Sequence, residues 1–296
     1  MLQGAGAHIL ELNFSCPQMA RSDAGHRVGQ DFGLIEKYTA AAKRACNIPV
    51  IAKMTPNITD MLPAALAAQQ GGADGISAIN TLKSISHVDL DASGASSYQV
   101  LPNISGHSAI SGFSGKAGRP IGLRFVSELA QDRRLTIPIS GMGGIYTWRD
   151  AAEYILLGSS NLQVTTSVMQ HGVGIVDEMK DGLRRHMIKN DVRTVSELIG
   201  RSAAHMVDPS KLNVSTEVVS KIDRDKCIGC GACVIACRHG SVEAIKLNSG
   251  NGIENGNGNG IRTAIVDPLK CIGCKLCDFV CPVDAISFTV RDRISR

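Results

Sequence analysis

Residues 270–282 read KCIGCKLCDFVCP, and this stretch decides the fold of the carboxyl-terminal part of the chain. Successive cysteines of the first three are separated by two residues, and a fourth follows after three more and precedes a proline. This is the spacing of thiolate ligands around an iron–sulfur cluster. A second run, KCIGCGACVIAC, occupies residues 226–237, and Arg238 follows it in place of the proline. Eight of the ten cysteines therefore belong to two four-cysteine runs.

The two runs together predict a pair of [4Fe–4S] clusters of the bacterial ferredoxin type, in which the fourth cysteine of each run binds the cluster of the other run. By this rule one cluster is bound by Cys227, Cys230, Cys233 and Cys281, and the other by Cys271, Cys274, Cys277 and Cys237. A disulfide framework and two zinc sites are the alternatives. Disulfides suit an oxidising compartment, and zinc sites more often show two separated cysteine pairs, so both fit less well.

Length and charge restrict the classes of protein to which the chain can belong. A chain of 296 residues has room for two domains. The net charge is +4 with 20% charged residues, and no block of lysine and arginine marks a nucleic-acid-binding surface. No window approaches the roughly 18 apolar residues of a membrane span, and the amino terminus lacks the pattern of a secretory signal. We expect a cytoplasmic protein that binds neither nucleic acid nor membrane.

Before the cysteine runs, short apolar stretches alternate with helical patterns, as is typical of βα repeats around a parallel sheet. A Ser/Gly-rich loop over 84–118 interrupts them, and loops of that length are usually functional or mobile. A Gly-Asn-rich segment over 248–260 has no apolar anchor and is expected to be disordered. Strands are expected over 8–14, 48–54, 75–80, 137–140 and 161–165, and helices over 32–45, 60–70, 120–131, 147–157 and 174–189.

These patterns predict an α/β fold in three segments. Residues 1–190 are expected to form a partial (β/α)₈ barrel of about five βα units, and residues 191–222 a linker with one short helix. Residues 223–296 are expected to form a small α+β two-cluster ferredoxin domain.

In such barrels the active site lies at the carboxyl ends of the strands. Amides and hydroxyls there can hydrogen-bond a flat polar heterocycle, and a glycine pair before a helix can cradle a phosphate. Each such residue alone is more often structural, since a lone cysteine is usually a small buried hydrophobe. Their shared position favours function. The residues at the expected strand ends are Asn13, Ser15, Cys16, Lys53, Asn80, Thr81, Gly141, Gly143, Gly144, Thr165 and Thr166.

Several motifs resemble a known family. ELNFSCP at 11–17 resembles the active-site signature of dihydroorotate dehydrogenases and dihydropyrimidine dehydrogenases. Together with the cysteine runs, the motifs are similar to the FMN- and ferredoxin-bearing subunits of bacterial NAD-dependent dihydropyrimidine dehydrogenases, over the whole chain except the Gly-Asn-rich segment. The stretches that favour these are GQD at 29–31, AKMTPNITD at 52–60, GGADG at 71–75, INT at 79–81, GFSG at 112–115 and SGMGGI at 140–145.

The resemblance implies an oxidoreductase of pyrimidine catabolism that reduces uracil or thymine to the 5,6-dihydropyrimidine. Cys16 would be the general acid that protonates C5, while reduced FMN gives hydride to C6. Asn13, Asn80 and Thr81 would bind the pyrimidine. Lys53 would contact the flavin ring, and the residues near the FMN ring or phosphate would be Gly115, Gly143, Gly144 and Thr166.

The resemblance also implies a partner. The clusters would pass electrons one at a time from a separate FAD-containing subunit that oxidises NADH, because this chain shows no GxGxxG after a strand for a dinucleotide. We therefore expect a hetero-oligomer.

One departure concerns the barrel. A full barrel has eight strands and typically about 250 residues, whereas five strand units precede the cysteine runs. We expect a fragment of a longer protein, with FMN bound weakly or not at all. A decayed form that keeps its electron-transfer tail is the alternative. Two further functions stay open: a flavin enzyme acting on dihydroorotate or another planar substrate, and a non-catalytic electron carrier whose barrel remnant docks a partner.

Overall fold

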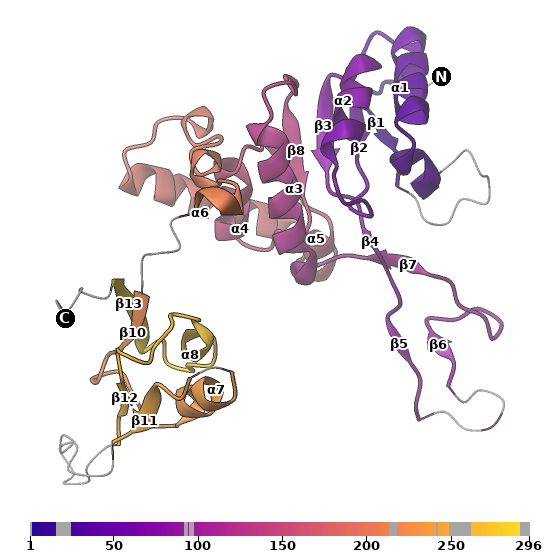
Figure 1. Ribbon diagram of the computed structural model, residues 1–296. Coiled ribbons are helices and arrows are strands. Elements are labelled where there is room, and N and C mark those ends of the chain that lie inside the picture. Colours follow the sequence, from indigo (N-terminus) through magenta and orange to yellow (C-terminus); the bar gives the residue numbers. More distant parts are fainter. Residues whose placement is uncertain are drawn as a thin grey trace. The chain divides into compact units, whose positions relative to one another are not determined.

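The computed structural model describes residues 2–15, 25–91, 94, 98–212, 218–240, 242–248 and 262–290 (Figure 1). They form two compact units, Met1–Val207 and Asp208–Arg296, which we call the barrel unit and the iron–sulfur unit. Each unit contains its own cluster of buried apolar side chains. None of the described helices is both long and apolar enough to cross a bilayer.

A five-stranded parallel sheet in the order β1-β2-β3-β8-β9 forms the centre of the barrel unit. All four residues of β3 and of β8 are buried, as expected for inner strands covered on both faces. Because the strands are parallel, their carboxyl ends meet at one edge of the sheet. The strands are β1 (Leu10–Asn13), β2 (Val50–Lys53), β3 (Gly75–Ala78), β8 (Ile139–Met142) and β9 (Asn161–Gln163).

Helices alternate with these strands, which confirms the expected βα order. Asp31 caps the first helix by accepting a hydrogen bond from the N–H of Leu34 at 3.0 Å. Thr147 and Asp150 form a capping box at the start of the fourth. The helices are α1 (Phe32–Ala45), α2 (Leu62–Gln70), α3 (Arg119–Gln131), α4 (Trp148–Leu156), α5 (Thr166–His171) and α6 (Gly174–Lys189). Short 3₁₀ turns cover Gln3–Ala5, Gly25–Gln30, Lys116–Gly118, Val195–Glu197, Ala203–His205 and Pro209–Lys211.

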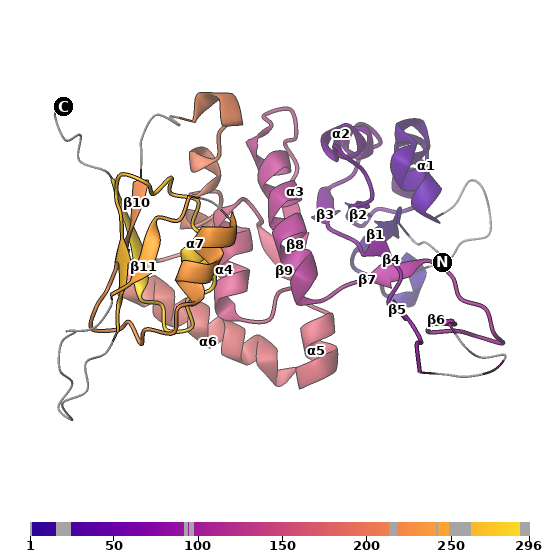
Figure 2. The same cartoon turned by 60° about the horizontal axis from the view of Figure 1, so that its bottom comes forward.

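The segment between β3 and α3 differs from the expected loop. It contains four short strands in two antiparallel pairs, β4 (Leu82–Ser84) with β7 (Ser111–Phe113) and β5 (His87–Val88) with β6 (Val100–Leu101). Figures 1 and 2 show this segment extending away from the five-stranded sheet. The expectation of a loop without strands was wrong, because strands of two or three residues are too short for an alternating apolar pattern to reveal them. Helix α5, absent from the expected set, is also only six residues long.

The iron–sulfur unit consists of two similar halves. Each half contains a strand, a cysteine run, a helix and a second strand. The elements are β10 (Val218–Ile222), α7 (Ala232–Gly240) and β11 (Ile245–Leu247), then β12 (Ala264–Val266), α8 (Leu276–Phe279) and β13 (Ile286–Val290). Antiparallel pairing joins β10 to β13 and β11 to β12.

Parts of the expected linker over 191–222 belong to the two units. Val192 and Leu198 are buried against Ile155 of α4, and the final residues of the range form β10. The segment expected to be disordered, 248–260, lies outside the described residues except for its first residue.

Candidate active site and iron–sulfur centres

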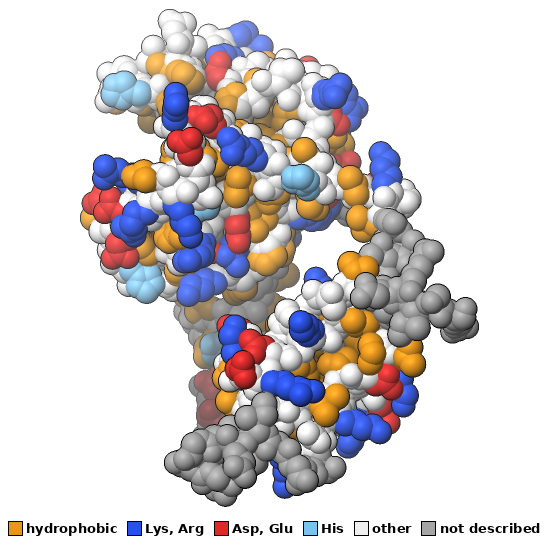
Figure 3. Space-filling model, turned by 90° about the vertical axis from the view of Figure 1, so that its left-hand side faces the viewer, with side chains coloured by type: hydrophobic (Ala, Val, Ile, Leu, Met, Phe, Trp, Pro, Cys, Tyr) orange, Lys and Arg blue, Asp and Glu red, His pale blue; other side chains and the backbone are white. Residues whose placement is uncertain are grey.

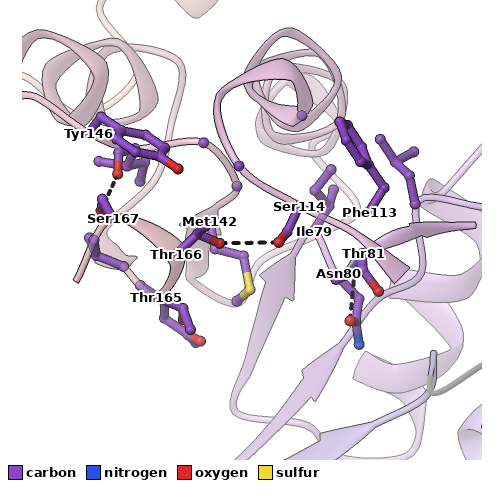
Figure 4. Close-up of a pocket in the computed structure, with 18 of the residues that line it drawn as sticks. Ile79, Asn80, Thr81, Phe113, Ser114, Met142, Tyr146, Thr165, Thr166 and Ser167 are labelled. Carbon is purple, nitrogen blue, oxygen red and sulfur yellow. Dashed lines mark hydrogen bonds between the residues drawn. The ribbon is translucent and has the colours of Figure 1, made fainter. Parts of the chain in front are cut away.

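A cavity of about 190 Å³ opens at the carboxyl ends of β2, β3, β8 and β9. Figure 4 shows that its walls come from segments far apart in the sequence, with Asn80 and Thr81 opposite Thr165 and Thr166. The fold brings together seven of the residues expected from the sequence at the flavin and substrate sites. They are Lys53, Asn80, Thr81, Gly115, Gly143, Gly144 and Thr166.

The predicted substrate asparagines lie beside each other. The side-chain amide of Asn80 donates to Oδ1 of Asn13 at 2.8 Å, although 67 residues separate them. Oδ1 of Asn13 also accepts from the N–H of Ser15 at 3.0 Å, and Oδ1 of Asn80 accepts from the N–H of Thr81 at 2.8 Å. These bonds hold two planar amides at fixed orientations, which suits the recognition of a flat ring with amide edges.

The carboxylate of Glu11, which sequence reasoning did not select, lies beside Lys53 at this site. Oε1 of Glu11 is 3.3 Å from Nζ of Lys53. Oε2 of Glu11 accepts from the hydroxyl of Ser77 at 2.8 Å and from the side-chain amide of Gln163 at 2.7 Å. Glu11 therefore joins residues of β1, β2, β3 and β9 and orients the predicted flavin-contacting lysine. A charged residue between the two leucines of the strand LELN was the signal available for it.

Glycines form the opposite wall of the cavity. Gly143 and Gly144 adopt φ of +117° and +70°, in the left-handed region that favours glycine. A Cβ at Gly144 would lie 2.9 Å from the backbone nitrogen of Arg119, at the start of α3. Within the described part of the chain, the N–H groups of both glycines lack a backbone partner. Free N–H groups on a turn without side chains fit the phosphate of a flavin nucleotide.

Tyr154 of α4 fixes this glycine turn. Its hydroxyl donates to the carbonyl oxygens of Gly143 at 2.7 Å and of Met142 at 3.1 Å. Burial raises the pKa of Tyr154, so the phenol stays a neutral donor. Asp150 at the start of the same helix pairs with Arg119 of α3. The two contacts hold the turn between two helices.

Two loops close the cavity near the expected FMN residues. The hydroxyl of Thr166 donates to that of Ser114 at 3.2 Å, as the dashed line in Figure 4 shows. Nζ of Lys116 lies 5.0 Å from the ring centroid of Tyr146, a cation–π contact. Sequence reasoning missed Ser114 and Tyr146, which line the cavity from connections without a regular pattern.

The predicted general acid, Cys16, lies outside the described residues, as do residues 17–24. Ser15 directly before it is buried, at 1% exposure. The backbone therefore enters this segment from the end of β1, where Asn13 contacts Asn80.

The eight run cysteines gather around two cavities in the iron–sulfur unit, in the crossed combination expected from the sequence. Cys227, Cys230, Cys233 and Cys281 line one cavity, which we call the first cluster site. Cys271, Cys274, Cys277 and Cys237 line the other, the second cluster site. Four thiols from two loops around each cavity suit a four-iron cluster. Among the described residues, no three Cys, His, Asp or Glu lie close enough to share a single metal ion.

Backbone groups donate to the fourth cysteine of each run. The N–H of Ala244 lies 3.2 Å from Sγ of Cys237, and the N–H of Ala285 lies 3.3 Å from Sγ of Cys281. Burial raises the pKa of Cys233 to about 11 and also raises that of Cys277. These thiols bind iron only as thiolates, so loading a cluster must release their protons.

Large apolar side chains are exposed beside the cysteine runs. Ile228 and Ile272 hold the same position in the two runs and are 57% and 65% exposed, and Phe279 of α8 is 89% exposed. Figure 3 shows apolar side chains among charged ones on the surface of this unit, the lower body in the view. Exposed apolar groups next to a redox centre are suited to contact with another protein.

Comparison with known proteins identifies the barrel. The family model described as dihydroorotate dehydrogenase matches residues 2–187. The chain belongs to the dihydroorotate dehydrogenase family. A second model, described as a 4Fe-4S dicluster domain, matches residues 220–288. The two matches confirm the expected fold and the expected cofactor classes, a flavin and iron–sulfur clusters.

Relatives of this dihydroorotate dehydrogenase-family chain differ in how much of it they match. The chain is 45% identical over 287 residues to the NAD-dependent dihydropyrimidine dehydrogenase subunit PreA of Escherichia coli, covering 97% of this chain and 66% of that protein. It is 38% identical to the chloroplastic dihydropyrimidine dehydrogenase (NADP(+)) of Arabidopsis thaliana, over 71% of this chain and 50% of that protein. The catalytic subunit of dihydroorotate dehydrogenase B from Pyrococcus abyssi is 39% identical, over 67% of this chain and 61% of that protein.

A solved structure supports the barrel fold. Dihydroorotate dehydrogenase from Eimeria tenella, solved with ferulenol, superposes with a TM-score of 0.52 at 22% identity, covering 66% of this chain and 54% of that chain. At this identity the likeness concerns the fold alone.

Proposed function

We propose that the chain is the FMN- and iron–sulfur-bearing subunit of an NADH-linked enzyme that reduces uracil or thymine to the 5,6-dihydropyrimidine. The observation that carries the proposal is the match to the Escherichia coli dihydropyrimidine dehydrogenase subunit over 97% of the chain, through both the barrel and the cysteine runs. When bound, FMN supplies the hydride and the two [4Fe–4S] clusters supply electrons one at a time.

Asn13, Asn80 and Thr81 would bind the pyrimidine. Uracil and thymine present alternating carbonyl and N–H groups, which an asparagine amide can pair with as both donor and acceptor. The 2.8 Å bond between the amides of Asn13 and Asn80 supports this role, because it fixes both planes before substrate arrives. Pre-organised amides of this kind lower the entropy cost of orienting the ring.

Cys16 would deliver the proton to C5. It follows Asn13 and Ser15 at the end of β1. An ordinary thiol has a pKa near ~8.5, so it holds its proton at neutral pH and can act as a general acid.

The opposite side of the cavity would hold FMN. Lys53, oriented by Glu11 at 3.3 Å, would place positive charge against the flavin ring. Gly143 and Gly144 would offer their N–H groups to the phosphate, and Gly115 and Thr166 would line the same face.

The eight run cysteines would bind the two clusters in their crossed sets, which the grouping around two cavities supports. Electrons would enter from a partner subunit that carries FAD and oxidises NADH. The exposed Ile228, Ile272 and Phe279 support contact with such a partner, and the assembly would be a hetero-oligomer.

A dihydroorotate-oxidising enzyme is the second candidate. The family model of the barrel and the Pyrococcus abyssi relative favour it. That relative, however, matches 197 residues, whereas the Escherichia coli relative matches 287. The iron–sulfur unit therefore favours the pyrimidine reductase.

The test is an anaerobic assay of the purified chain with a reduced viologen dye, which can load the clusters without a partner. We expect about eight iron atoms per chain. With FMN added in excess, because a barrel fragment is expected to bind it weakly, we expect consumption of uracil or thymine but not orotate. Reduction of orotate alone would favour the dihydroorotate reading. Iron-loaded protein that consumes no pyrimidine at saturating FMN would favour a non-catalytic electron carrier, and zinc in place of iron would overturn the cluster assignment.

A variant adds a test of the substrate site. Asn80→Ala should raise the KM for uracil while FMN and iron content stay unchanged. Asn103→Ala is the matched control, because that amide contacts Gln99 at 3.0 Å outside the cavity.

A further inference from the structure

The two halves of the iron–sulfur unit can be aligned residue by residue. Asp223 and Asp267 each stand four residues before the first cysteine of a run, and their carbonyl oxygens accept from the N–H of Cys227 at 3.0 Å and of Cys271 at 3.1 Å. The side chain of each aspartate also accepts from the backbone N–H two residues later, at 3.0 Å in both halves. The halves therefore share one local geometry.

This alignment pairs Ser220 of β10 with Ala264 of β12, each three residues before its aspartate. Both are buried, at 4% and 3% exposure. Because the ligand sets are crossed, Ser220 lines the second cluster site and Ala264 lines the first. Equivalent positions over the two sites thus hold a hydroxyl in one case and a methyl group in the other.

The hydroxyl of Ser220 contacts two cysteines of the second cluster site, Cys277 and Cys271. Its Oγ lies 3.6 Å from Sγ of Cys271, and its backbone N–H lies 3.5 Å from the same sulfur. A thiolate has no proton to give, so in the loaded protein the serine must be the donor. The described residues include no corresponding contact between Ala264 and Cys227. The amide contacts of Ala244 and Ala285, by contrast, occur in both halves.

We propose that Ser220 tunes the second cluster, donating a hydrogen bond to the Cys271 thiolate that makes this cluster easier to reduce than the first. The inference rests on the crossed cluster ligation in the proposed function. A hydrogen bond to a ligand sulfur stabilises the extra negative charge of the reduced cluster and raises its potential. Each cluster takes up one electron from an added reductant, and no bond is formed or broken.

Nearby charges do not replace this effect. Lys275 stands beside Cys274 where Gly231 stands beside Cys230, which adds a positive charge to the second site. Asp278, exposed on α8 after Cys277, carries the opposite charge where Val234 stands in the other half. The two charges oppose each other, and both are screened by solvent. The hydroxyl of Ser220, by contrast, belongs to a residue that is only 4% exposed, so solvent screens it little.

The test compares Ser220→Ala with the reciprocal Ala264→Ser in the full chain. Anaerobic reduction at controlled potential is followed by electron paramagnetic resonance, which detects reduced clusters. We expect two separate one-electron waves in the unchanged chain. Ser220→Ala should lower the midpoint potential of the upper wave only. The shift should correspond to about a 2- to 10-fold change in the equilibrium constant for reduction, the size of one net hydrogen bond. Tenfold corresponds to about 59 mV for a one-electron couple.

Two further variants sharpen the test. Ser220→Thr keeps the hydroxyl and should keep the upper wave near its original potential. Ala264→Ser should raise only the lower wave, because it places a hydroxyl at the first site. The inference would be overturned if both clusters were intact and Ser220→Ala left both reduction potentials unchanged. It would also be overturned if Ala264→Ser shifted the potential of the upper wave. In either case the cluster assignment would still hold. Fewer than two clusters in the unchanged chain would overturn the assignment and the inference together.

Discussion

At the scale of single residues, Glu11 connects the sheet to the chemistry of the cavity. It is the one acidic side chain paired with Lys53 among the described residues, and it also accepts hydrogen bonds from β3 and β9. The pair is partly exposed, with 22% of the Lys53 side chain and 29% of the Glu11 side chain accessible. The pair therefore contributes little to the free energy of unfolding. Its larger effect should be on the electrostatic potential around the predicted flavin site.

Glu11→Gln should raise the reduction potential of bound FMN, because the charge of Lys53 is no longer opposed and reduced flavin is anionic. The amide oxygen still accepts a hydrogen bond, so the free energy of unfolding should change by less than about 1 kcal/mol. Potential-controlled flavin absorbance measures the shift. Glu128→Gln is the control, since Glu128 pairs with Arg124 on the exposed face of α3 at 2.8 Å. A potential that stays constant or falls would contradict the role of Glu11.

Cys16→Ala should slow pyrimidine reduction by roughly 10²–10⁴-fold, the usual contribution of a general acid. FMN and iron content should not change. Cys16→Ser should remain slow and shift its activity towards higher pH, because a hydroxyl is a much weaker acid than a thiol. Cys46→Ala serves as control. Its thiol donates to the carbonyl of Ala42 at 3.3 Å, at the end of α1. Wild-type turnover in Cys16→Ala would exclude Cys16 as the donor.

At the scale of elements, the turn between β8 and α4 depends on glycine for two reasons. Gly144 combines a left-handed φ of +70° with backbone atoms of Arg119 and Gly115 within 2.9 Å of where a Cβ would lie. Gly172 after α5 has a similar φ of +81° but open space around it. Substitutions at the two glycines therefore distinguish the effect of a strained φ from the effect of steric overlap.

Gly144→Ala should destabilise the barrel unit by about 1–3 kcal/mol and abolish FMN binding, because the turn must move away from α3. Gly172→Ala should cost about 1–2 kcal/mol through its φ alone and keep FMN. Thermal unfolding and flavin fluorescence after denaturation measure the two effects. Equal loss of FMN in both variants would show that strain, and not the turn's position, controls binding.

At the scale of the whole molecule, the two units have different sources of stability. The barrel unit has a core of aliphatic and aromatic side chains such as Ile35, Phe125 and Tyr154. Among its described residues, the iron–sulfur unit has a core of eight buried residues, of which four are the cysteines Cys233, Cys237, Cys271 and Cys277. Half of that small core therefore consists of predicted cluster ligands, and its folding should depend on the clusters.

Removal of iron with an anaerobic chelator should unfold the iron–sulfur unit and spare the barrel unit. Hydrogen exchange followed by peptide mass analysis should show lost protection in β10 and β13 and retained protection in β2, β3 and β8. Reconstitution with iron and sulfide should restore protection. A protected β10–β13 pair in iron-free protein would mean that the apolar contacts suffice on their own.

The sequence by itself determined the features that depend on local spacing and period. The cysteine spacing predicted two crossed ligand sets, as in two-cluster ferredoxins, and the eight cysteines line two cavities in those same groups. The βα alternation specified the parallel sheet, and helices over 32–45 and 174–189 have the bounds that their patterns indicate. Strand-end position also selected several residues that line the cavity, such as Lys53, Asn80 and Gly143, since the carboxyl ends of parallel strands share one edge.

Tertiary structure alone decided which side chains meet across the sheet. Glu11 reaches Gln163 over 152 residues of sequence, and no local pattern encodes that pairing. The short strands β4 to β7 form only by pairing with each other, because two or three residues are too few to carry a periodic signal. The inequality of the two cluster sites arises in the same way. Ser220 and Ala264 become equivalent only because the two halves fold alike. In the folded unit Ser220 lines the second cluster site and Ala264 lines the first.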